Sequence, residues 1–379
     1  MPVFSLLVVL LHFYVGVRLI PALGLSGPGI ALAVAVLLCS FLAIPIGLRS
    51  RRVRAGQRFE RLVFLAFVAM GWFASLWVLT LTRDVILLAA SAIGALAPGL
   101  FSLPQLSHDS AVAVPLLAAL ASAWGFLNAR RVARVVDLDV PIANLAEALR
   151  GFRIVQISDI HVGPTIKHDY LDAIVERVNH LNPEEIANTG DLVDGSVAQL
   201  ARHVAPLARL RARHGVFFVT GNHEYYSGAN AWVAELRRLG ITVLLNEHVM
   251  LDHLGSALLV AGVTDFGAHH FDESHRSDPR AALAGAPSGT MTKVLLAHQP
   301  RSAAGAERAG FDLQLSGHTH GGQFFPWNLF VRLQQPFTAG LHRLGRLWVY
   351  TSRGTGYWGP PKRLFAPSEI TQLHLIPAA

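Results

Sequence analysis

Hydrophobic and polar positions divide this chain of 379 residues into two parts. The first third consists of five apolar stretches separated by short polar segments, and each stretch approaches the ~20 residues that cross a bilayer core. The fourth stretch, rich in Ala and Gly with Pro98 inside it, has the weakest pattern. We therefore predict an α-helical membrane region over residues 1–130 with four or five spans. The stretches are residues 3–23, 29–48, 62–81, 85–103 and 111–127.

The pattern changes after about residue 137, where short apolar runs end in polar turns and alternate with segments of helical spacing. Runs such as "FRIVQISDIHVG" and "TKVLLAHQP" are typical of buried strands with reactive groups at their carboxyl ends, whereas "YLDAIVERVNHLNPEE" has the spacing of a helix. Alternating strands and helices predict a layered α/β domain. We expect this domain to occupy residues 151–379, with residues 131–150 as a linker.

Charge is distributed unevenly between the two parts. Residues 1–128 contain eight arginines, no lysine and three acidic residues, and the net charge of the whole chain is +7. Basic residues beside apolar runs fit membrane topology. The second part has no cluster of lysine and arginine with interleaved aromatic residues, so we expect the bilayer as a partner and no nucleic acid.

Two groups of arginines give conflicting signals about membrane sidedness. Six arginines lie between Arg49 and Arg61, which predicts a cytoplasmic loop. Arg130, Arg131 and Arg134 follow the last apolar stretch and favour the same side for the second domain. If all five stretches cross the membrane, the two groups lie on opposite sides unless the fourth stretch is re-entrant. The apolar pattern therefore leaves open which side carries the second domain.

Five strand ends in the second part carry acids, amides or imidazoles. A single Asp at a strand end is usually a turn former, but five such ends in succession indicate a common site. The chain has one cysteine, Cys39, inside an apolar stretch, so carboxylate, imidazole or amide groups would have to bind any metal. The residues are Asp159, His161, Asp191, Asp194, Asn222, His223, His298, His318 and His320.

This combination of residue types fits a pair of divalent cations. Two cations about 3.5–4 Å apart neutralise phosphate charge, supply hydroxide at neutral pH and stabilise a departing alkoxide. They need a carboxylate that can bridge them, together with ligands that leave coordination positions open. Glycines such as Gly190, Gly221 and Gly317 allow the backbone to turn sharply beside the ions. The second part is therefore predicted to hydrolyse a phosphorus ester at a two-metal site.

The motifs "SDIH", "GDLVD", "GNHE", "AHQP" and "GHTH" follow one another in this order. With them the chain resembles the calcineurin-like metallophosphoesterase superfamily over residues 151–376. The longer phrases "FRIVQISDIHVG", "LLAHQP" and "LSGHTHGGQ", behind several apolar spans, resemble its transmembrane-anchored bacterial branch. Some members of that branch are similar to enzymes that cleave the pyrophosphate of UDP-2,3-diacylglucosamine. The resemblance implies a four-layer αββα sandwich for the second domain.

The resemblance also implies a ligand set for two divalent cations, such as Mn, Fe or Zn. One metal would be held by Asp159, His161, Asp191 and His320. The other would be held by Asp191, Asn222, His298 and His318, with Asp191 bridging the two.

Further side chains have implied roles beside these metals. Asp191 would take part in catalysis as the bridging ligand of a site that activates hydroxide. His223 would contact the phosphate and act as general acid toward the leaving oxygen, a role that imidazole suits at physiological pH. Asp194 and Glu224 would orient the ligands, a common need around metal-binding histidines.

The chain departs from the serine/threonine protein phosphatases of this superfamily at one position. Those enzymes carry Arg directly after the second Asp of G-D-x-x-D, whereas here Gly195 stands in that place, which argues against a phosphoprotein substrate. Arg353 and Arg363, in "SRGTGYWGPPKR", are candidates to contact the substrate phosphate or else are solvated surface arginines. Trp327 and Trp358 fit either a lipid-facing rim or core packing.

We expect an integral, multi-pass protein of the bacterial inner membrane that hydrolyses a phosphoester or pyrophosphate bond. A membrane anchor favours a phospholipid or a nucleotide-linked glycolipid, because it concentrates the enzyme at a lipid substrate. A soluble phosphodiester such as a cyclic nucleotide is the enzymatic alternative. A non-catalytic scaffold is a second class, but such a protein is expected to have lost ligands that are all present here. A transporter or sensor with a phosphoesterase output is a third class, and the few charged residues in the spans argue against it.

Overall fold

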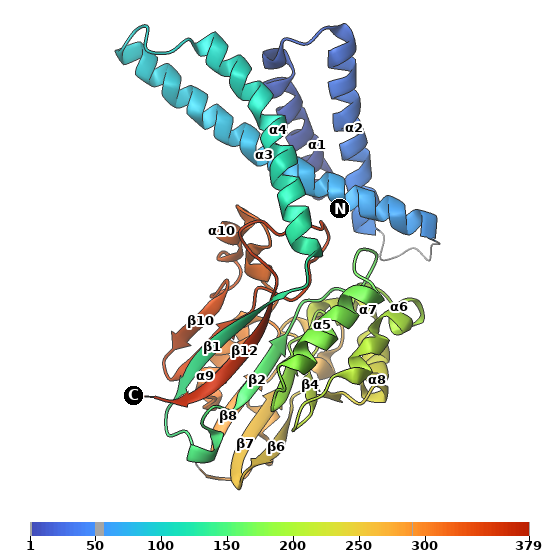
Figure 1. Ribbon diagram of the computed structural model, residues 1–379, viewed down its shortest axis with the longest axis vertical. Helices are drawn as coiled ribbons and strands as arrows, with labels where there is room; N and C mark the ends of the chain where they lie inside the picture. Colours follow the sequence, from blue (N-terminus) through green and yellow to red (C-terminus); the bar gives the residue numbers. More distant parts are fainter. Residues whose placement is uncertain (1, 50–56, 290, 379) are drawn as a thin grey trace. The chain divides into compact units, whose positions relative to one another are not determined.

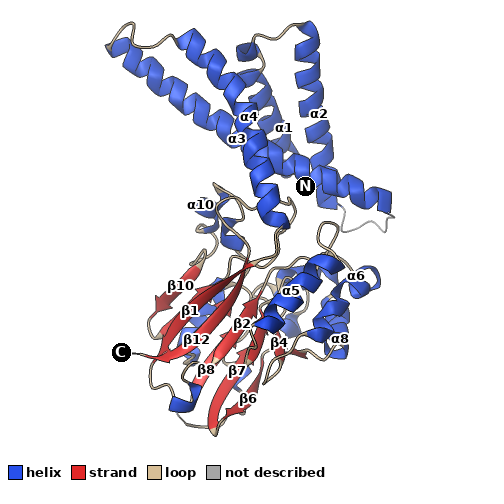
Figure 2. Ribbon diagram, in the orientation of Figure 1, coloured by secondary structure: helices blue, strands red, loops and turns tan. Residues whose placement is uncertain are grey.

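The computed structural model describes residues 2–49, 57–289 and 291–378. The chain forms two compact units, which we call the helical unit and the α/β unit (Figures 1 and 2). The helical unit comprises Met1–Leu127 and Gly359–Lys362, and the α/β unit comprises Asn128–Trp358 and Arg363–Ala379.

Four long helices make up most of the helical unit. Each is long and apolar enough to cross a membrane. The last three residues of the fourth helix already belong to the α/β unit. The helices are α1 (Pro2–Leu19), α2 (Gly27–Arg49), α3 (Gln57–Leu96) and α4 (Leu103–Arg130).

The third and fourth apolar stretches lie in one helix, so the five stretches correspond to four helices. α3 has 40 residues and continues through Arg83 and Asp84, which separate the two stretches in the sequence. Asp84 Oδ2 accepts a hydrogen bond from Arg18 Nε at 2.7 Å, and Arg83 Nη2 donates to Ser107 Oγ at 2.9 Å. Because α1 and α4 provide these partners, the polar pair does not require a break in the helix. The arginine-rich loop after α2 lies mostly outside the described residues.

The α/β unit contains two six-stranded mixed sheets. In the first, β2 to β5 are parallel, and in the second, β7, β8, β9 and β11 are parallel. The first sheet has the order β1 (Arg134–Ile142), β12 (Glu369–Pro377), β2 (Arg153–Ile157), β3 (Glu185–Asn188), β4 (Val216–Phe218), β5 (Thr242–Val243). The second has the order β10 (Gly340–Leu344), β11 (Leu347–Thr351), β9 (Leu313–Ser316), β8 (Thr292–Leu296), β7 (Ser256–Gly262), β6 (Glu247–His253).

Side-chain alternation along the strands produces three separate apolar cores. Val155 of β2 packs toward α5 (His168–His180) and α8 (Ala229–Arg238), which with α6 (Val197–Val204) cover the first sheet. Its neighbour Ile154 faces the second sheet, because successive side chains of a strand point to opposite faces. A third core lies between the second sheet and α9 (Ala303–Ala309). The unit is therefore the expected four-layer αββα sandwich.

The expected linker, residues 131–150, contains strand β1 and is part of the sandwich. β1 pairs in parallel with β12 along all nine of its residues, from Arg134 opposite Glu369 onward. Val140 and Ile142 are buried in the core between the two sheets. The alternation of apolar and polar residues in "VVDLDVPI" is the local signal for this strand.

Candidate metal centre

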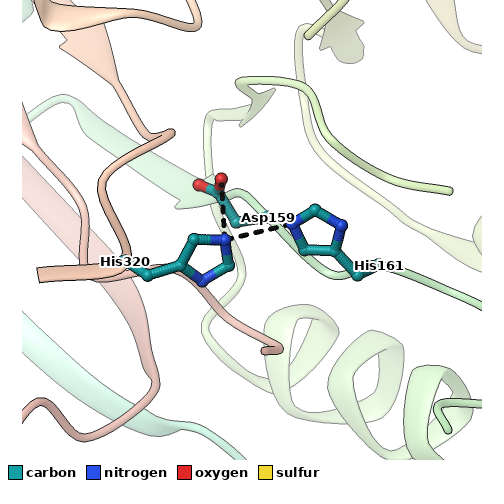
Figure 3. Close-up of side chains that lie close together, drawn as sticks. All are labelled: Asp159, His161 and His320. Atoms are coloured by element: carbon teal, nitrogen blue, oxygen red, sulfur yellow. Dashed lines mark hydrogen bonds and ion pairs between the residues drawn. The ribbon is translucent and has the colours of Figure 1, made fainter. Parts of the chain in front are cut away.

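The first group of metal-binding side chains comes from the loops after β2 and β9. Asp159, His161 and His320 are buried and point toward one another (Figure 3). The Nε2 atoms of His161 and His320 are 3.0 Å apart, and His320 Nε2 is 3.5 Å from Asp159 Oδ1. Ser158 Oγ donates a hydrogen bond to Asp159 Oδ2 at 2.6 Å, which orients the carboxylate.

The second group comes from the loops after β3, β8 and β9. His298 Nε2 lies 3.3 Å from Asp191 Oδ2 and 3.1 Å from His318 Nδ1. His298 Nδ1 donates to the carbonyl oxygen of Thr189 at 2.7 Å, so its Nε2 atom is available to a ligand. Asn222, at the start of α7 (Asn222–Ser227), has a buried Oδ1 atom without a hydrogen-bond partner among the described residues.

Asp191 lies between the two groups. Its Oδ2 atom is 3.3 Å from His298 Nε2 and 3.8 Å from His161 Nε2, which belong to different groups. Its Oδ1 atom accepts a hydrogen bond from the backbone N–H of His223 at 2.8 Å. One carboxylate therefore contacts residues from both groups, as a bridging ligand must.

His223 lies beside these groups and is held by Asp194. Asp194 Oδ1 accepts a hydrogen bond from His223 Nδ1 at 2.5 Å, while its Oδ2 atom is 3.3 Å from His161 Nδ1. The Glu224 carboxylate accepts hydrogen bonds from the backbone N–H groups of Asp191 and Gly221, at 3.0 and 2.7 Å. These two acids connect neighbouring loops and orient the side chains that face the centre.

The loops that carry the ligands have unusual backbone conformations. Five ligand-type residues have positive φ angles between 51° and 69°, in the left-handed region that costs non-glycine residues roughly 1 kcal/mol each. Such residues cluster at functional sites, where the surrounding fold maintains the strain. They are Asp159, His161, Asp191, His318 and His320.

Two glycines are required by close contacts at the centre. A Cβ atom at Gly317 would lie 2.1 Å from Asp159 Oδ2, and one at Gly221 would lie 2.2 Å from Asp191 Oδ1. Any larger residue would displace these carboxylates. The glycines of the GHTH and GNHE motifs therefore allow the ligand loops to approach each other.

The carboxylates set the protonation of the facing imidazoles. Burial opposes protonation of His298, but the Asp191 carboxylate raises its pKa to about 10. Burial and the charge of His298 lower the pKa of His318 to about 3. Burial also opposes protonation of His161, but the neighbouring aspartates raise its pKa. Burial and the charge of His161 keep the pKa of His320 well below its ordinary value. In each facing pair the aspartates therefore raise the pKa of one imidazole, while burial lowers that of the other.

The residues fit a pair of divalent cations. The two groups offer only carboxylate oxygens and imidazole nitrogens, which are suitable ligands for Mn, Fe and Zn. The buried Asn222 Oδ1 atom, which has no partner among the described residues, adds an amide oxygen. A cation would satisfy this atom and replace the protons on the imidazoles, because metal ligands bind in their deprotonated forms.

The structure does not support substrate contact by Arg363. Its side chain is fully buried, and Arg363 Nη1 donates to the carbonyl oxygens of His320 and Arg353 at 2.9 and 2.7 Å. A guanidinium that is already satisfied by backbone carbonyls cannot bind a phosphate, so Arg363 positions the His320 loop. Arg353 is partly exposed and pairs with the buried Glu369 carboxylate at 3.0 Å.

Asp265 is a residue near the centre that the sequence patterns missed. It follows β7, the neighbour of β8, and is buried; burial raises its pKa, although the nearby His298 acts in the opposite direction. Asp265 Oδ1 accepts a hydrogen bond from Gln299 Nε2 at 2.8 Å. The run "SALLVAGVTD" has the same pattern of a strand followed by an acid, and this was the available signal.

Comparison with known proteins agrees with this centre. Residues 152–322 match the calcineurin-like phosphoesterase family. The chain is 38% identical over 277 residues to a transmembrane protein with metallophosphoesterase domain from Danio rerio, covering 71% of this chain and 63% of the relative. It is 41% identical over 283 residues to the Bos taurus protein of that description, covering 72% and 63%. It is 38% identical over 264 residues to a metallophosphoesterase of Helicobacter pylori strain J99, covering 69% of each chain.

The chain therefore belongs to the calcineurin-like metallophosphoesterase family. Its four apolar helices and its transmembrane relatives indicate a membrane protein. The matched region spans less than two thirds of the length of the two animal relatives.

Proposed function

We propose that the protein is a metal-dependent phosphohydrolase that cleaves a phosphoester or phosphoanhydride bond. The main support is Asp191, whose carboxylate contacts two groups of buried ligand side chains at once. A scaffold without activity would have no need to keep strained ligand loops at this position.

The ligand assignment follows the two groups. Asp159, His161, Asp191 and His320 would hold one cation. Asp191, Asn222, His298 and His318 would hold the other. When bound, the cations would neutralise phosphate charge and lower the pKa of water.

His223 is proposed as the general acid. His223 Nδ1 is hydrogen-bonded to Asp194, and His223 Nε2 is 3.9 Å from Asp191 Oδ2 at the edge of the centre. An imidazole in this position can donate a proton to a leaving oxygen, and the hydrogen bond to Asp194 fixes the orientation of the ring.

The substrate class is proposed from the membrane anchor. Four apolar helices keep the α/β unit at a bilayer, where the local concentration of a lipid substrate is high. We therefore favour a phospholipid or a nucleotide-linked glycolipid, such as one similar to UDP-2,3-diacylglucosamine. A panel of lipid-linked and soluble phosphoesters would distinguish this class from soluble cyclic nucleotides.

Substitutions at Asp191 and His223 test the proposed activity. The full-length protein, purified and supplied with Mn²⁺ or Zn²⁺, should hydrolyse bis(p-nitrophenyl) phosphate. Asp191→Asn should abolish hydrolysis and reduce bound metal, whereas His223→Asn should slow hydrolysis about 10²–10⁴-fold with metal content nearly unchanged. Asp169→Asn, at a fully exposed position on α5, is the matched control.

Two results would contradict this assignment. Hydrolysis retained in Asp191→Asn would exclude the two-metal mechanism. Equal loss of metal in both variants, measured by elemental analysis, would show that His223 is a ligand and not the general acid.

We also infer a multi-pass protein of the bacterial inner membrane with the α/β unit on the cytoplasmic side. If each of the four described helices crosses once, the loop after α2 and the segment after α4 lie on the same side. Both arginine groups then lie on that side, as the positive-inside rule favours. With four crossings, the two arginine groups no longer give conflicting signals about membrane sidedness.

A further inference from the structure

Six large apolar side chains are exposed on one part of the α/β unit. Five of them follow the His320 loop in or beside α10 (Trp327–Val331), and the sixth lies shortly before β12. Their exposed fractions range from 40% for Trp327 to 84% for Phe365. We call them the apolar patch: Phe325, Trp327, Leu329, Phe330, Leu333 and Phe365.

The patch is continuous although its residues come from two segments. Phe324 forms β-bridges with Leu364 and Phe365, which brings Phe365 next to Phe325. The ring centroids of Trp327 and Phe330 are 5.7 Å apart. Contiguous apolar surfaces of this kind on soluble domains usually mark an interaction site, since water solvates them poorly.

The segment that leads into the patch is hydrogen-bonded to a residue beside His223. Gln323 Nε2 donates to the Trp358 carbonyl oxygen, and the Trp358 N–H donates to Gln323 Oε1, both at 2.9 Å. The Trp358 ring is 38% exposed, and its centroid lies 5.8 Å from that of His223. A partly exposed apolar residue therefore lies between the proposed general acid and the segment that leads into the patch.

The last turn of the candidate membrane helix α4 contacts the segment that carries Phe365. Asn128 Nδ2 donates to the carbonyl oxygen of Arg363, two residues before Phe365, at 3.3 Å. Arg130 Nη1 donates to Tyr357 Oη at 3.2 Å. These α4 residues belong to the α/β unit, so the patch lies at the end of that unit where the chain leaves α4.

One exposed basic residue adjoins the patch, and no acidic residue lies near it in the sequence. Between Asp312 and Glu369 the sequence contains no Asp or Glu, and of its basic residues Lys362 and Arg363 are buried. Arg332 is exposed beside Leu333. Aromatic and basic residues together are typical of surfaces that lie in the membrane interface, where aromatic rings reach the acyl chains and cations reach the headgroups.

We propose that the apolar patch lies in the lipid–water interface of the bilayer that holds α4. The metal centre then takes its substrate from the membrane surface past Trp358. The position of the patch is independent of catalysis, whereas the route of the substrate rests on the proposed phosphohydrolase function.

Fluorescent probes at single cysteines test the position of the patch. In a Cys39→Ala background of the full-length protein, Leu333→Cys and Phe365→Cys would carry an environment-sensitive probe. Leu254→Cys is the matched control, because Leu254 is 68% exposed in the turn between β6 and β7, at the opposite end of the sandwich from α10 (Figure 1). All three would be measured in phosphatidylcholine and phosphatidylglycerol vesicles with and without doxyl-labelled lipid.

The quenching pattern decides whether the patch contacts lipid. We expect doxyl lipid to quench the probes at 333 and 365 and shift their emission to the blue, with the probe at 254 unaffected. Equal quenching at all three positions, or none at 333 and 365, would overturn the proposal. Hydrolysis of bis(p-nitrophenyl) phosphate at the parent rate would show that each labelled variant is folded.

A second experiment tests the route of the substrate. The double variant Leu333→Asp/Phe365→Asp should hydrolyse soluble bis(p-nitrophenyl) phosphate at the parent rate. Its rate on hexadecyl p-nitrophenyl phosphate in the same vesicles should fall about tenfold, because charged residues leave the interface. An unchanged rate on the vesicle ester would refute the route. Absence of hydrolysis of both esters by the parent protein would refute the proposed function. The quenching result would still show whether the patch contacts lipid.

Discussion

Asn222 is the residue at which the metal proposal is most directly testable. Its Oδ1 atom is buried without a hydrogen-bond partner among the described residues, an arrangement that costs about 1–3 kcal/mol unless a ligand satisfies it. A divalent cation would satisfy it. The other predicted ligands are charged or titratable, so substituting them changes the electrostatics of the whole centre.

We predict that Asn222→Ala weakens binding of one of two cations by at least about tenfold. The free energy of unfolding of the metal-free protein should stay the same or increase, because an unsatisfied buried atom is removed. Titration with Mn²⁺ followed by calorimetry would measure this, with the exposed Asn230→Ala on α8 as control. Two undisturbed binding events in Asn222→Ala would exclude Asn222 as a ligand.

Two adjacent glutamates at the start of β3 predict opposite pH effects on stability. Glu185 is fully buried, its carboxylate oxygens have no partners among the described residues, and burial raises its pKa to about 8. Burial also acts to raise the pKa of Glu184, but hydrogen bonds from Arg153 lower it overall. Folding therefore disfavours the ionised form of Glu185 and favours the ionised form of Glu184.

We predict that Glu185→Gln raises the apparent Tm at pH 8 by on the order of 5 °C. The folded state holds the Glu185 proton up to about pH 8, whereas the unfolded chain releases it near its ordinary pKa of 4.5, so stability is lost as pH rises through this window. Thermal unfolding of the full-length protein from pH 5 to 8 would show the difference growing with pH. A constant difference would contradict the assignment.

Glu184→Gln should have the opposite effect. The lowered pKa of Glu184 contributes stability above its ordinary value of 4.5, and this contribution is lost as pH falls through the folded pKa. The variant should therefore be less stable than the parent at pH 7 and similar to it in strong acid. The same unfolding series measures both variants.

At the scale of elements, the loop after β9 depends on a buried arginine from another segment. Arg363 donates hydrogen bonds to the carbonyl oxygen of His320 in this loop and to those of Arg353 and Gly356 after β11. His320, Gly321 and Gly322 all have positive φ angles, so this turn needs external support. Arg363 provides that support from the segment before β12.

We predict that Arg363→Met and Arg363→Lys both destabilise the protein by on the order of 3 kcal/mol and reduce bound metal. Lysine keeps the charge but lacks the planar set of donors. Thermal unfolding and metal content would be compared with the exposed Arg211→Met. A raised KM with unchanged Tm would instead indicate that Arg363 contacts the substrate.

At the scale of the whole molecule, the number of helices determines sidedness. With four crossings, the amino terminus, the loop after α2 and the α/β unit share one side, and both arginine groups favour the cytoplasm. With five crossings, no orientation satisfies both groups. The continuity of α3 through Arg83 and Asp84 supports the count of four.

We predict that a green fluorescent protein fused to the carboxyl terminus fluoresces in a bacterial host, and that alkaline phosphatase fused there is inactive. A fusion after residue 102, between α3 and α4, should give the reverse result and serves as the internal control. The same report from both positions would show that α4 does not cross the membrane.

Local sequence was sufficient for several features of this protein. Run length and hydrophobicity predicted the membrane helices, because these depend on residues within one segment. The candidate ligands could be found because each lies directly after a strand, and parallel strands bring their carboxyl ends to one edge of the sheet. Residue type also limited the metal chemistry to oxygen and nitrogen ligands.

Other features depended on pairing between distant segments, which a one-dimensional pattern does not contain. Arg134 pairs with Glu369, so a segment that looked like a linker is a strand of the first sheet. Arg363 fitted a surface residue or a phosphate ligand in the sequence, but the fold encloses it among backbone carbonyls, including that of His320. Asp265 lies near the metal centre because β7 is the neighbour of β8. Burial and polar contacts arise when the layers pack together, and at these positions they decide the role of a side chain.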